Sequence, residues 1–220
     1  MNKALLIFVK LPIAGKVKTR LGKDVGNTQA ALFYAAFVED LLARVDKSEI
    51  ETLIFFDPEE PASEYNKWLG NRRLIPQRGK DLGKRMLNAF IDAFKLGYDK
   101  CVLIGSDLPD LSTSTIKKGL AVLGKYPACI GPAKDGGYYL IGFQAETLTE
   151  IPFTNICWST PHVFEQTMQK FKSAKLEPYV LPEHSDVDTL EDLISLLQNK
   201  ECEKNCPNTF KTYQDYLKIT

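Results

Sequence analysis

The chain has 220 residues, of which 28 are basic and 28 acidic, so its formal net charge is zero. A chain of this length can bury one full hydrophobic core, and its 44% hydrophobic and 25% charged residues exclude disorder for most of it. The balanced charge argues against a dedicated nucleic-acid binder. No apolar run approaches the roughly 20 residues of a membrane-spanning helix, and no secretory signal is visible, so we expect a cytoplasmic protein.

Seven short apolar runs predict the strands of a sheet. Most of them are continuous rather than alternating, which is typical of strands that are covered on both faces, as in a parallel sheet. The runs span residues 4–9, 52–56, 73–75, 101–104, 128–131, 138–143 and 177–181.

Segments with helical spacing lie between these runs, and they span residues 27–45, 82–96, 113–123, 161–171 and 189–197. Asn27 or Thr28 stands where the first helix needs an N-terminal cap, and Gly97 stands where the second needs a C-terminal glycine. The repeated order of strand and helix predicts an α/β fold, a three-layer α/β/α sandwich around a mainly parallel, mixed sheet.

We expect one domain over residues 1–198, because no repeat, linker or low-complexity tract divides the chain. Residues 199–220 begin with a polar stretch and continue with spaced aromatic residues. This pattern predicts a short helix packed on the same domain, and a frayed tail is the alternative. Cys202 and Cys206 in this tail either share a helical face or pair, and an odd cysteine count with two histidines leaves no complete zinc set.

Ligands bind beyond the carboxyl ends of the strands in open α/β sheets, so the loops there are the candidate site. The loop after the first predicted strand joins a flexible backbone to three cations, which suits a polyphosphate. The competing interpretation is a solvated basic turn, and the loop lacks the pattern of a Walker A motif. Its candidate residues are Leu11, Pro12, Gly15, Lys16, Lys18, Thr19 and Arg20.

Asp107 comes directly after the fourth predicted strand, in the sequence GSDLPD. A carboxylate there suits a hard cation such as Mg²⁺, which proteins hold with one or two carboxylates and substrate phosphates. The alternative is that Asp107 or Ser112 caps the next helix, and Asp110 could serve the turn in the same way. Spacing alone does not separate the two interpretations.

The sequence GPAKDGGYYLIG of residues 131–142 also has two interpretations. Asp135, Gly136 and Gly137 form a tight turn between strands, or the paired glycines let a ligand approach the backbone. In the second case Asp135 is available to accept a proton from a hydroxyl group.

Two further polar segments stand before helices. Residues 77–85, with Gly79, Leu82 and Gly83, form a base- or sugar-reading segment or an ordinary connection. The acidic sequence DVDTLED, residues 186–192, is explained by helix capping through Asp188 or Thr189, and taken alone it requires no function.

In this order, the motifs KVKTRL, QRGKDLGKRM, GSDLP, GPAKDGGYYLIG, CWST and DVDTLEDL resemble a bacterial and archaeal family of transferases found beside radical-SAM and selenium-related genes. The resemblance runs from about Ala4 to Leu197. It implies the GT-A fold of nucleotide-diphospho-sugar transferases. The KTRL loop and the last acidic motif are also similar to those of 2-phospholactate guanylyltransferases.

The resemblance implies that residues 11–21 hold a nucleotide, with Lys18 and Arg20 against its phosphates. Asp107 and Asp188 match the aspartates that hold the divalent metal, Mg²⁺ or Mn²⁺. Two signatures depart from the wider superfamily: SDL replaces the DxD of many glycosyltransferases, and the long motif of sugar pyrophosphorylases is absent.

The motifs leave three functions open. We place first the transfer of a sugar from a nucleoside diphosphate to a small-molecule acceptor, with Asp135 orienting or deprotonating the attacking hydroxyl. The second is nucleotidyl transfer to a phosphorylated acceptor with release of pyrophosphate, and the third is a degenerate nucleotide-binding module. The remaining candidates for substrate contact are Asp110, Gly136, Gly137 and Trp158, although packing is the favoured interpretation for Trp158.

Overall fold

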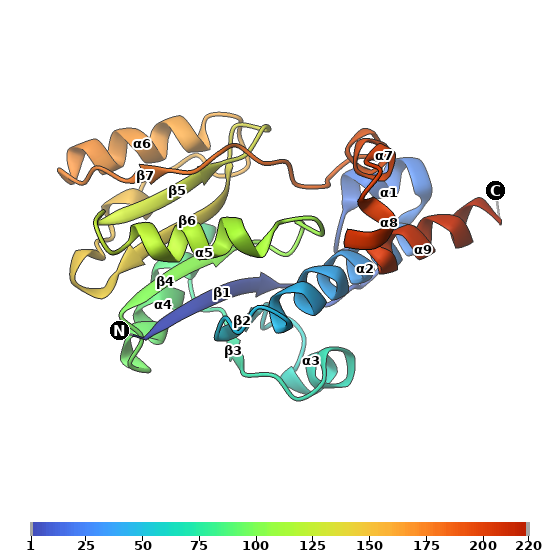
Figure 1. Cartoon of the computed structure of the whole chain (residues 1–220), viewed down its shortest axis with the longest axis horizontal. Coiled ribbons are helices and arrows are strands. Elements are labelled where there is room, and N and C mark those ends of the chain that lie inside the picture. Colours follow the sequence, from blue (N-terminus) through green and yellow to red (C-terminus); the bar gives the residue numbers. More distant parts are fainter. Residues whose placement is uncertain (1, 219–220) are drawn as a thin grey trace.

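The computed structural model describes residues 2–218, in which seven strands form one sheet in the order β3-β2-β1-β4-β6-β5-β7 (Figure 1). β1 to β4 are mutually parallel, β6 is antiparallel to both of its neighbours, and β7 is parallel to β5. The strands are β1 (Lys3–Val9), β2 (Thr52–Phe56), β3 (Leu74–Pro76), β4 (Lys100–Ile104), β5 (Ala128–Pro132), β6 (Tyr138–Gln144) and β7 (Tyr179–Val180).

Helices cover both faces of this sheet, because successive residues of each buried strand point to opposite sides. Leu5 and Ile7 pack with α2, α3 and α5, whereas Leu6 and Phe55 pack with α4 and α6 on the other face. The helices are α1 (Thr19–Val25), α2 (Asn27–Asp46), α3 (Ala62–Leu69), α4 (Leu82–Lys95), α5 (Thr113–Val122), α6 (Val163–Ser173), α7 (Leu190–Gln198), α8 (Cys202–Asn205) and α9 (Pro207–Leu217), with the 3-10 turns η1 (Ala145–Thr147) and η2 (Ile151–Phe153). None of the described helices is long and apolar enough to cross a membrane.

This architecture confirms the predicted three-layer sandwich with a mainly parallel, mixed sheet. Every predicted strand and helix is present, with ends within two residues of the prediction. The sequence did not predict α1 and α3, which are short and bury only one or two residues each. The predicted capping of α2 by Asn27 or Thr28 is wrong: the cap is Gly26, whose φ of 85° lets the chain turn from α1 directly into α2.

The C-terminal segment forms α8 and α9, and α9 lies along α2 (Figure 1). The carboxylate of Asp40, which is buried, accepts hydrogen bonds from the backbone and side chains of Asn208 and Thr209 at 2.7 to 3.0 Å. A side chain of α2 therefore caps the start of α9. Cys202 and Cys206 are buried free thiols in the small core beneath these helices.

The start of α7 carries the capping pattern that the sequence predicts. Thr189 Oγ1 accepts a hydrogen bond from the backbone of Asp192, and the Asp192 carboxylate accepts one from the backbone of Thr189. Replacing Thr189 by alanine should lower the free energy of unfolding by about 1 kcal/mol, measured by urea denaturation. Ser195→Ala, an exposed substitution inside the same helix, should not destabilise, because alanine is the better helix former. Equal losses in the two variants would contradict the capping role.

Candidate active site

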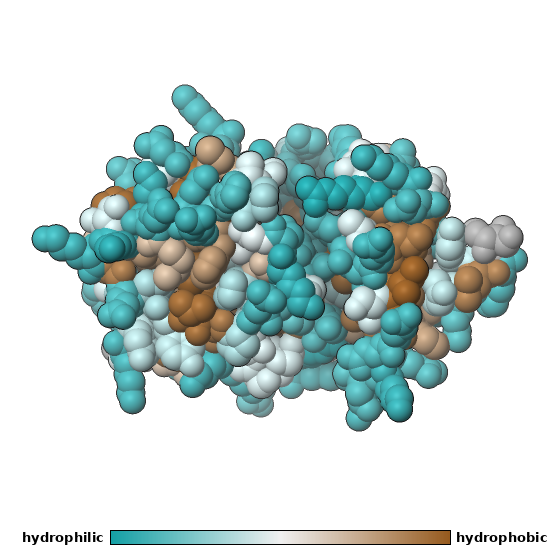
Figure 2. All heavy atoms as spheres, turned by 90° about the horizontal axis from the view of Figure 1, so that it is seen from above, coloured by the Kyte–Doolittle hydropathy of each residue, from teal (hydrophilic) through white to brown (hydrophobic). Residues whose placement is uncertain are grey.

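A cleft of about 870 Å³ lies at the edge of the sheet where β1 and β4 end. Its walls come from the loops after β1, β3 and β4, the turn between β5 and β6, residues 158–161 and the segment after β7. Hydrophilic residues dominate the middle of the face seen in Figure 2, between more apolar patches. The loops that the sequence analysis singled out therefore share one cavity.

Lys18 is at the centre of the charged wall of the cleft. Its Nζ lies 2.7 Å from Asp107 Oδ2 and 2.6 Å from Asp188 Oδ1, and its side chain is 3% exposed. Burial alone would lower the pKa of this ammonium group, but the two carboxylates outweigh it and hold the pKa above its ordinary value. Lys18 is therefore a charged, buried partner of both aspartates.

The backbone at Lys18 has a conformation that is unusual for a lysine. Lys18 is the N-cap of α1 and has a φ of 47°, a left-handed conformation that costs a residue with a Cβ about 1 kcal/mol. Such a conformation persists where the surrounding contacts determine it, here the two ion pairs of the side chain. Next along the chain, Arg20 keeps its Nη1 3.6 Å from the second oxygen of Asp188.

The carboxylates come from three separate segments. Asp107 follows β4, Asp186 and Asp188 follow β7, and the backbone N–H of Val187 donates to the carbonyl oxygen of Asp107 at 3.0 Å. Asp135 is in the turn between β5 and β6, where its Oδ1 accepts a hydrogen bond from the backbone of Gly137 at 2.8 Å. All four carboxylates line the cleft. The two interpretations of Asp135 are therefore compatible: its side chain closes the turn and also lines the cavity.

The donor set decides what kind of cation the cleft could hold. Within residues 2–218 no group of three His, Cys, Asp or Glu side chains is close enough to form a complete metal site. Asp107 and Asp188 are two hard oxygen donors that converge on one point, and each contacts Lys18 through one oxygen only. They fit a cation such as Mg²⁺, whose other ligands are commonly phosphate and water, and do not form a self-contained metal cage.

A second set of polar groups also borders the cleft. Arg85 Nη1 lies 3.2 Å from the carboxylate of Asp57, and the side chain of Gln77 donates to the carbonyl oxygen of Phe55 at 2.9 Å. Also in the lining, the Tyr34 hydroxyl lies 2.8 Å from Ser106 Oγ, and burial raises the pKa of Tyr34 above its ordinary value. These contacts hold the segments that follow β2, β3 and β4 in place.

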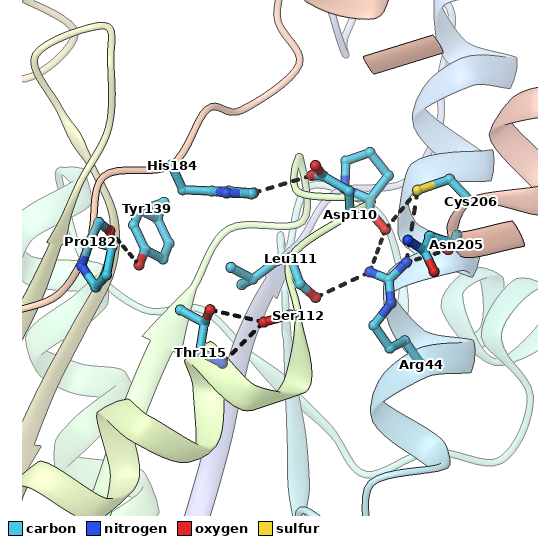
Figure 3. Close-up of polar contacts among 11 residues, drawn as sticks. Arg44, Asp110, Leu111, Ser112, Thr115, Tyr139, Pro182, His184, Asn205 and Cys206 are labelled. Atoms are coloured by element: carbon cyan, nitrogen blue, oxygen red, sulfur yellow. Dashed lines mark hydrogen bonds and ion pairs between the residues drawn. The ribbon is translucent and has the colours of Figure 1, made fainter. Parts of the chain in front are cut away.

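A second contact joins the loops that carry Asp107 and Asp188, the two candidate metal ligands (Figure 3). His184 Nε2 lies 3.1 Å from Asp110 Oδ1, and the ring of Tyr139 packs edge-on against His184. Asp110 follows Asp107 on one loop, and His184 precedes Asp188 on the other. The contact therefore helps to fix the separation of the two carboxylates.

Arg44, on α2, supports the same loop from behind (Figure 3). Its Nη1 donates to the carbonyl oxygens of Pro109 at 2.6 Å and Leu111 at 3.1 Å, and its Nη2 donates to that of Asn205. The thiol of Cys206 also donates to the Pro109 carbonyl, at 3.3 Å. The loop after β4 is thus anchored to α2 and to the C-terminal helices.

The structure brings most of the predicted site residues into the cleft. Those that line it are Lys16, Lys18, Thr19, Arg20, Leu82, Asp107, Asp135, Gly137, Trp158 and Asp188. Trp158 also packs against the ring of Tyr138, as expected from its packing interpretation. Lys16 is at the rim, where its Nζ lies 2.9 Å from Glu60 Oε1.

Other predicted residues lie outside the lining, and packing explains three of them. A Cβ on Gly83 would meet the Phe153 carbonyl and the Trp158 ring, so this glycine lets α4 approach η2 closely. A Cβ on Gly136 would meet the backbone of Pro161, and one on Gly79 would meet the start of α4. Outside the lining as well are Leu11, which borders a small separate cavity, Pro12, Gly15, and Asp110, which contacts His184.

Sequence reasoning missed Asp186, although the acidic DVD run was a signal for it. Burial, and then the nearby carboxylates of Asp188 and Asp135, raise the pKa of Asp186 to about 6. Arg85 had a weak signal, since it ends the QRGKDLGKR segment. Tyr34 had no signal in the sequence, because it fits the apolar helical pattern of α2 like its neighbours.

The raised pKa of Asp186 predicts how stability changes with pH in the metal-free protein. The folded state holds this proton more tightly than the unfolded state does, so the contribution of Asp186 to stability is most favourable below about pH 4 and falls as the pH rises to about 6. Asp186→Asn should therefore stabilise the protein at pH 7.5 by about 1 to 2 kcal/mol, allowing for solvent screening, and should have no such effect at pH 4. Urea denaturation in EDTA at both pH values measures this difference.

The control is Asp24→Asn, which removes the same charge from an exposed position of α1. A stabilisation by Asp186→Asn that is the same at both pH values, or is matched by Asp24→Asn, would contradict burial of the Asp186 charge.

Comparison with solved structures places this geometry in a known fold. A protein from Desulfovibrio desulfuricans G20, provisionally named a nucleotide-diphospho-sugar transferase, is 38% identical, with a TM-score of 0.93 over 100% of this chain and 97% of that one. A cytidylyltransferase from Leptospira borgpetersenii is 15% identical, with a TM-score of 0.60 over 100% and 93% of the two chains. CMP:2-keto-3-deoxy-manno-octonic acid synthetase complexed with CTP is 11% identical, with a TM-score of 0.57 over 89% and 97%. A search of curated proteins found no match.

The fold is thus that of the nucleotide-diphospho-sugar transferases, as the sequence motifs predicted. A family description also matches residues 41–160, a range that includes Asp107 and Asp135 but ends before Asp188 and begins after Lys18. This range is more than half of the chain, and the protein belongs to the family described as "Uncharacterized protein conserved in bacteria (DUF2064)".

Proposed function

We propose that the protein is a metal-dependent transferase that moves a sugar from a nucleoside diphosphate to the hydroxyl group of a small acceptor. The observation that carries the proposal is the convergence of Asp107 and Asp188 on Lys18 in the cleft at the carboxyl edge of the sheet. The name of the 38% identical protein supports the class of donor. A site that combines hard oxygen donors with buried and surface cations suits a metal-bound diphosphate.

The charged wall would bind the diphosphate. Asp107 and Asp188 would hold Mg²⁺ or Mn²⁺, which when bound neutralises phosphate charge and so assists the departure of the nucleoside diphosphate. Lys18 and Arg20 carry fixed positive charge on the same wall, where the leaving diphosphate gains negative charge. The positive charge of Lys16 at the rim helps to attract the anionic donor into the cleft.

The acceptor would react at the turn between β5 and β6. Its hydroxyl oxygen attacks the anomeric carbon of the sugar, the bond from that carbon to the phosphate oxygen breaks, and the nucleoside diphosphate leaves. Asp135 takes the hydroxyl proton, because it lines the cleft and the hydrogen bond from Gly137 occupies only one of its oxygens. Trp158 and Tyr138 provide an aromatic wall on which a sugar ring can pack.

Nucleotidyl transfer is the second candidate, and the pairing of Lys18 and Arg20 with the aspartates favours it. In this reaction an acceptor phosphate attacks the α-phosphorus of a nucleoside triphosphate, and pyrophosphate leaves. The attacking oxygen is already ionised, so the reaction needs no general base. The fold shared with a cytidylyltransferase is compatible with this reaction.

Incubation with Mg²⁺ and a panel of nucleotide sugars and nucleoside triphosphates, with sugar alcohols and sugar phosphates as acceptors, tests the proposal. Release of a nucleoside diphosphate supports sugar transfer, whereas release of pyrophosphate supports the second candidate. Binding without release would identify a degenerate binding module, and no metal-dependent binding at all would overturn the proposal.

The variant Asp135→Asn separates the two reactions. It should slow sugar transfer by about 100-fold or more, since a positioned base commonly contributes this much, and should leave nucleotidyl transfer nearly unchanged. An unaltered rate of sugar transfer in Asp135→Asn would remove the residue from the mechanism.

A further inference from the structure

Lys18 occupies the position between two carboxylates that a divalent cation would take. Its ammonium group touches both Asp107 and Asp188, with nearly all of its side chain buried. Asp107 and Asp188 are themselves about one-third exposed, at 35% and 33%, so solvent and solutes reach them from the cleft. Lys18 therefore offsets one of the two negative charges of the pair, and Arg20 lies 3.6 Å from Asp188 as a second cation.

The neighbouring lysine shows that this placement is specific to position 18. Lys16 is two residues earlier in the same loop, yet its side chain is 51% exposed and pairs with Glu60 at the rim. Lys18 has a left-handed backbone and a buried side chain, whereas Lys16 is not among the described residues with a positive φ. One loop thus presents an outer lysine and an inner one.

We propose that Lys18 is an exchangeable internal counterion, which bridges Asp107 and Asp188 until a phosphate group captures its ammonium and a divalent cation replaces it. The inference rests on the proposed function, and it adds an order to the binding events. The cation binds weakly alone, and nucleotide and cation bind in mutual dependence.

Electrostatics supports this exchange. A divalent cation that entered while Lys18 stayed would meet a positive charge at the shared carboxylates, and the repulsion between like charges is strong at such distances in a partly buried site. Lys18 cannot simply leave either, because a buried charge without a partner is costly. A phosphate group in the cleft solves both problems, since it offers the lysine a new anionic partner and offers the cation further oxygen ligands.

Mutual dependence follows from thermodynamic linkage. If the phosphate group draws Lys18 from the aspartates and thereby raises the affinity for the cation, the cation must raise the affinity for the nucleotide by the same factor. The free protein would then hold little metal, and the site would assemble only around its substrate.

The first experiment measures Mn²⁺ binding alone, by the electron paramagnetic resonance signal of free Mn²⁺, with no nucleotide present. Lys18→Met and Lys18→Gln should bind Mn²⁺ at least about tenfold more tightly than the wild type, because the competing charge is gone. Lys16→Met, the matched control, should bind as the wild type does. Adding Asp188→Asn to Lys18→Met should remove the gain, which assigns the bound ion to this site.

The second experiment measures the nucleotide that binds in the panel above, in the presence of Mg²⁺, by isothermal titration calorimetry. Lys18→Met should bind it about tenfold more weakly, because the phosphate loses a charged partner. The opposite signs of the two changes are the signature of exchange, since general damage to the fold would weaken both. Circular dichroism confirms that each variant is folded.

A third measurement requires no variant. Wild-type crystals soaked in Mn²⁺ alone should show no anomalous density between Asp107 and Asp188, with Lys18 still in contact with both. Density there with Lys18 in place, or Mn²⁺ affinity that is equal in the wild type and both Lys18 variants, would overturn the inference and leave the proposed function standing. A panel without any nucleotide binding would instead overturn the proposed function, and the Mn²⁺ measurements would still decide the place of Lys18.

Discussion

Replacing Asp107 by asparagine should strongly weaken metal-dependent nucleotide binding and leave the protein folded. Among residues 2–218, Asp107 and Asp188 are the two carboxylates that contact Lys18 and that fit a shared cation, so an amide at position 107 removes half of this charged donor set. We expect the affinity for nucleotide in Mg²⁺ to fall by about 100-fold or more, and turnover to fall with it. Calorimetric titration in Mg²⁺ and in EDTA measures the loss.

The same loop offers a matched control for this prediction. Asp110→Asn changes an aspartate three residues later that contacts His184 and lies outside the cleft lining. It should reduce affinity far less than Asp107→Asn. If both variants lose affinity equally, Asp110 contacts substrate as the sequence analysis first suggested, and if neither does, the metal site lies elsewhere.

Thermal unfolding completes this test. Asp107→Asn still leaves Lys18 in contact with Asp188, so the buried ammonium keeps an ionic partner and the variant should remain folded. A variant that unfolds would indicate that Asp107 matters chiefly for stability, and loss of binding would then carry no information on the metal.

The sequence located the site because its polar residues come directly after buried strands. Asp107 follows β4 and the cationic loop follows β1, and these two strands are parallel neighbours, so their loops must meet at one edge of the sheet. Asp188 was harder to assign, since helix capping explained its motif fully. Only the resemblance to a transferase family connected Asp188 with Asp107, and the fold places both on Lys18.

Side-chain direction is what the sequence could not supply. Gly136 is predicted as a place where a ligand approaches the backbone, and Gly79 and Gly83 as part of a base- or sugar-reading segment, yet protein atoms fill the space beside each of them. A glycine required for close packing and one required for a ligand leave the same mark in a sequence. The neighbour that uses the space, here η2 or Pro161, is known only when the chain is folded.

Long-range contacts behind the site were equally hidden. The hydrogen bonds of Arg44 to Pro109 and Asn205 connect positions 65 and 161 residues away in the chain. Nothing in the local pattern of α2 distinguishes this arginine from a solvent-exposed one. Its role depends on where the C-terminal helices and the loop after β4 come to lie.

Arg44→Met should both destabilise the protein and weaken binding at a cleft that Arg44 does not line. Methionine keeps the length of the side chain but removes the donors to Pro109, Leu111 and Asn205, and the partly buried carbonyl groups of Pro109 and Leu111 then lose a charged partner. We expect the free energy of unfolding to fall by about 2 to 3 kcal/mol. We also expect a three- to tenfold loss of metal-dependent nucleotide affinity, roughly, because the loop that carries Asp107 loses its support.

Arg72→Met is the control. Arg72 pairs with Asp46 at the end of the same helix, and this ion pair does not involve the loop after β4. It should cost about 1 kcal/mol or less and leave affinity unchanged. Urea denaturation and calorimetric titration on both variants separate the two effects of Arg44. A loss of stability without a loss of affinity would mean that Asp107 is positioned by its own strand and by Lys18, and that the C-terminal helices brace the fold without tuning the site.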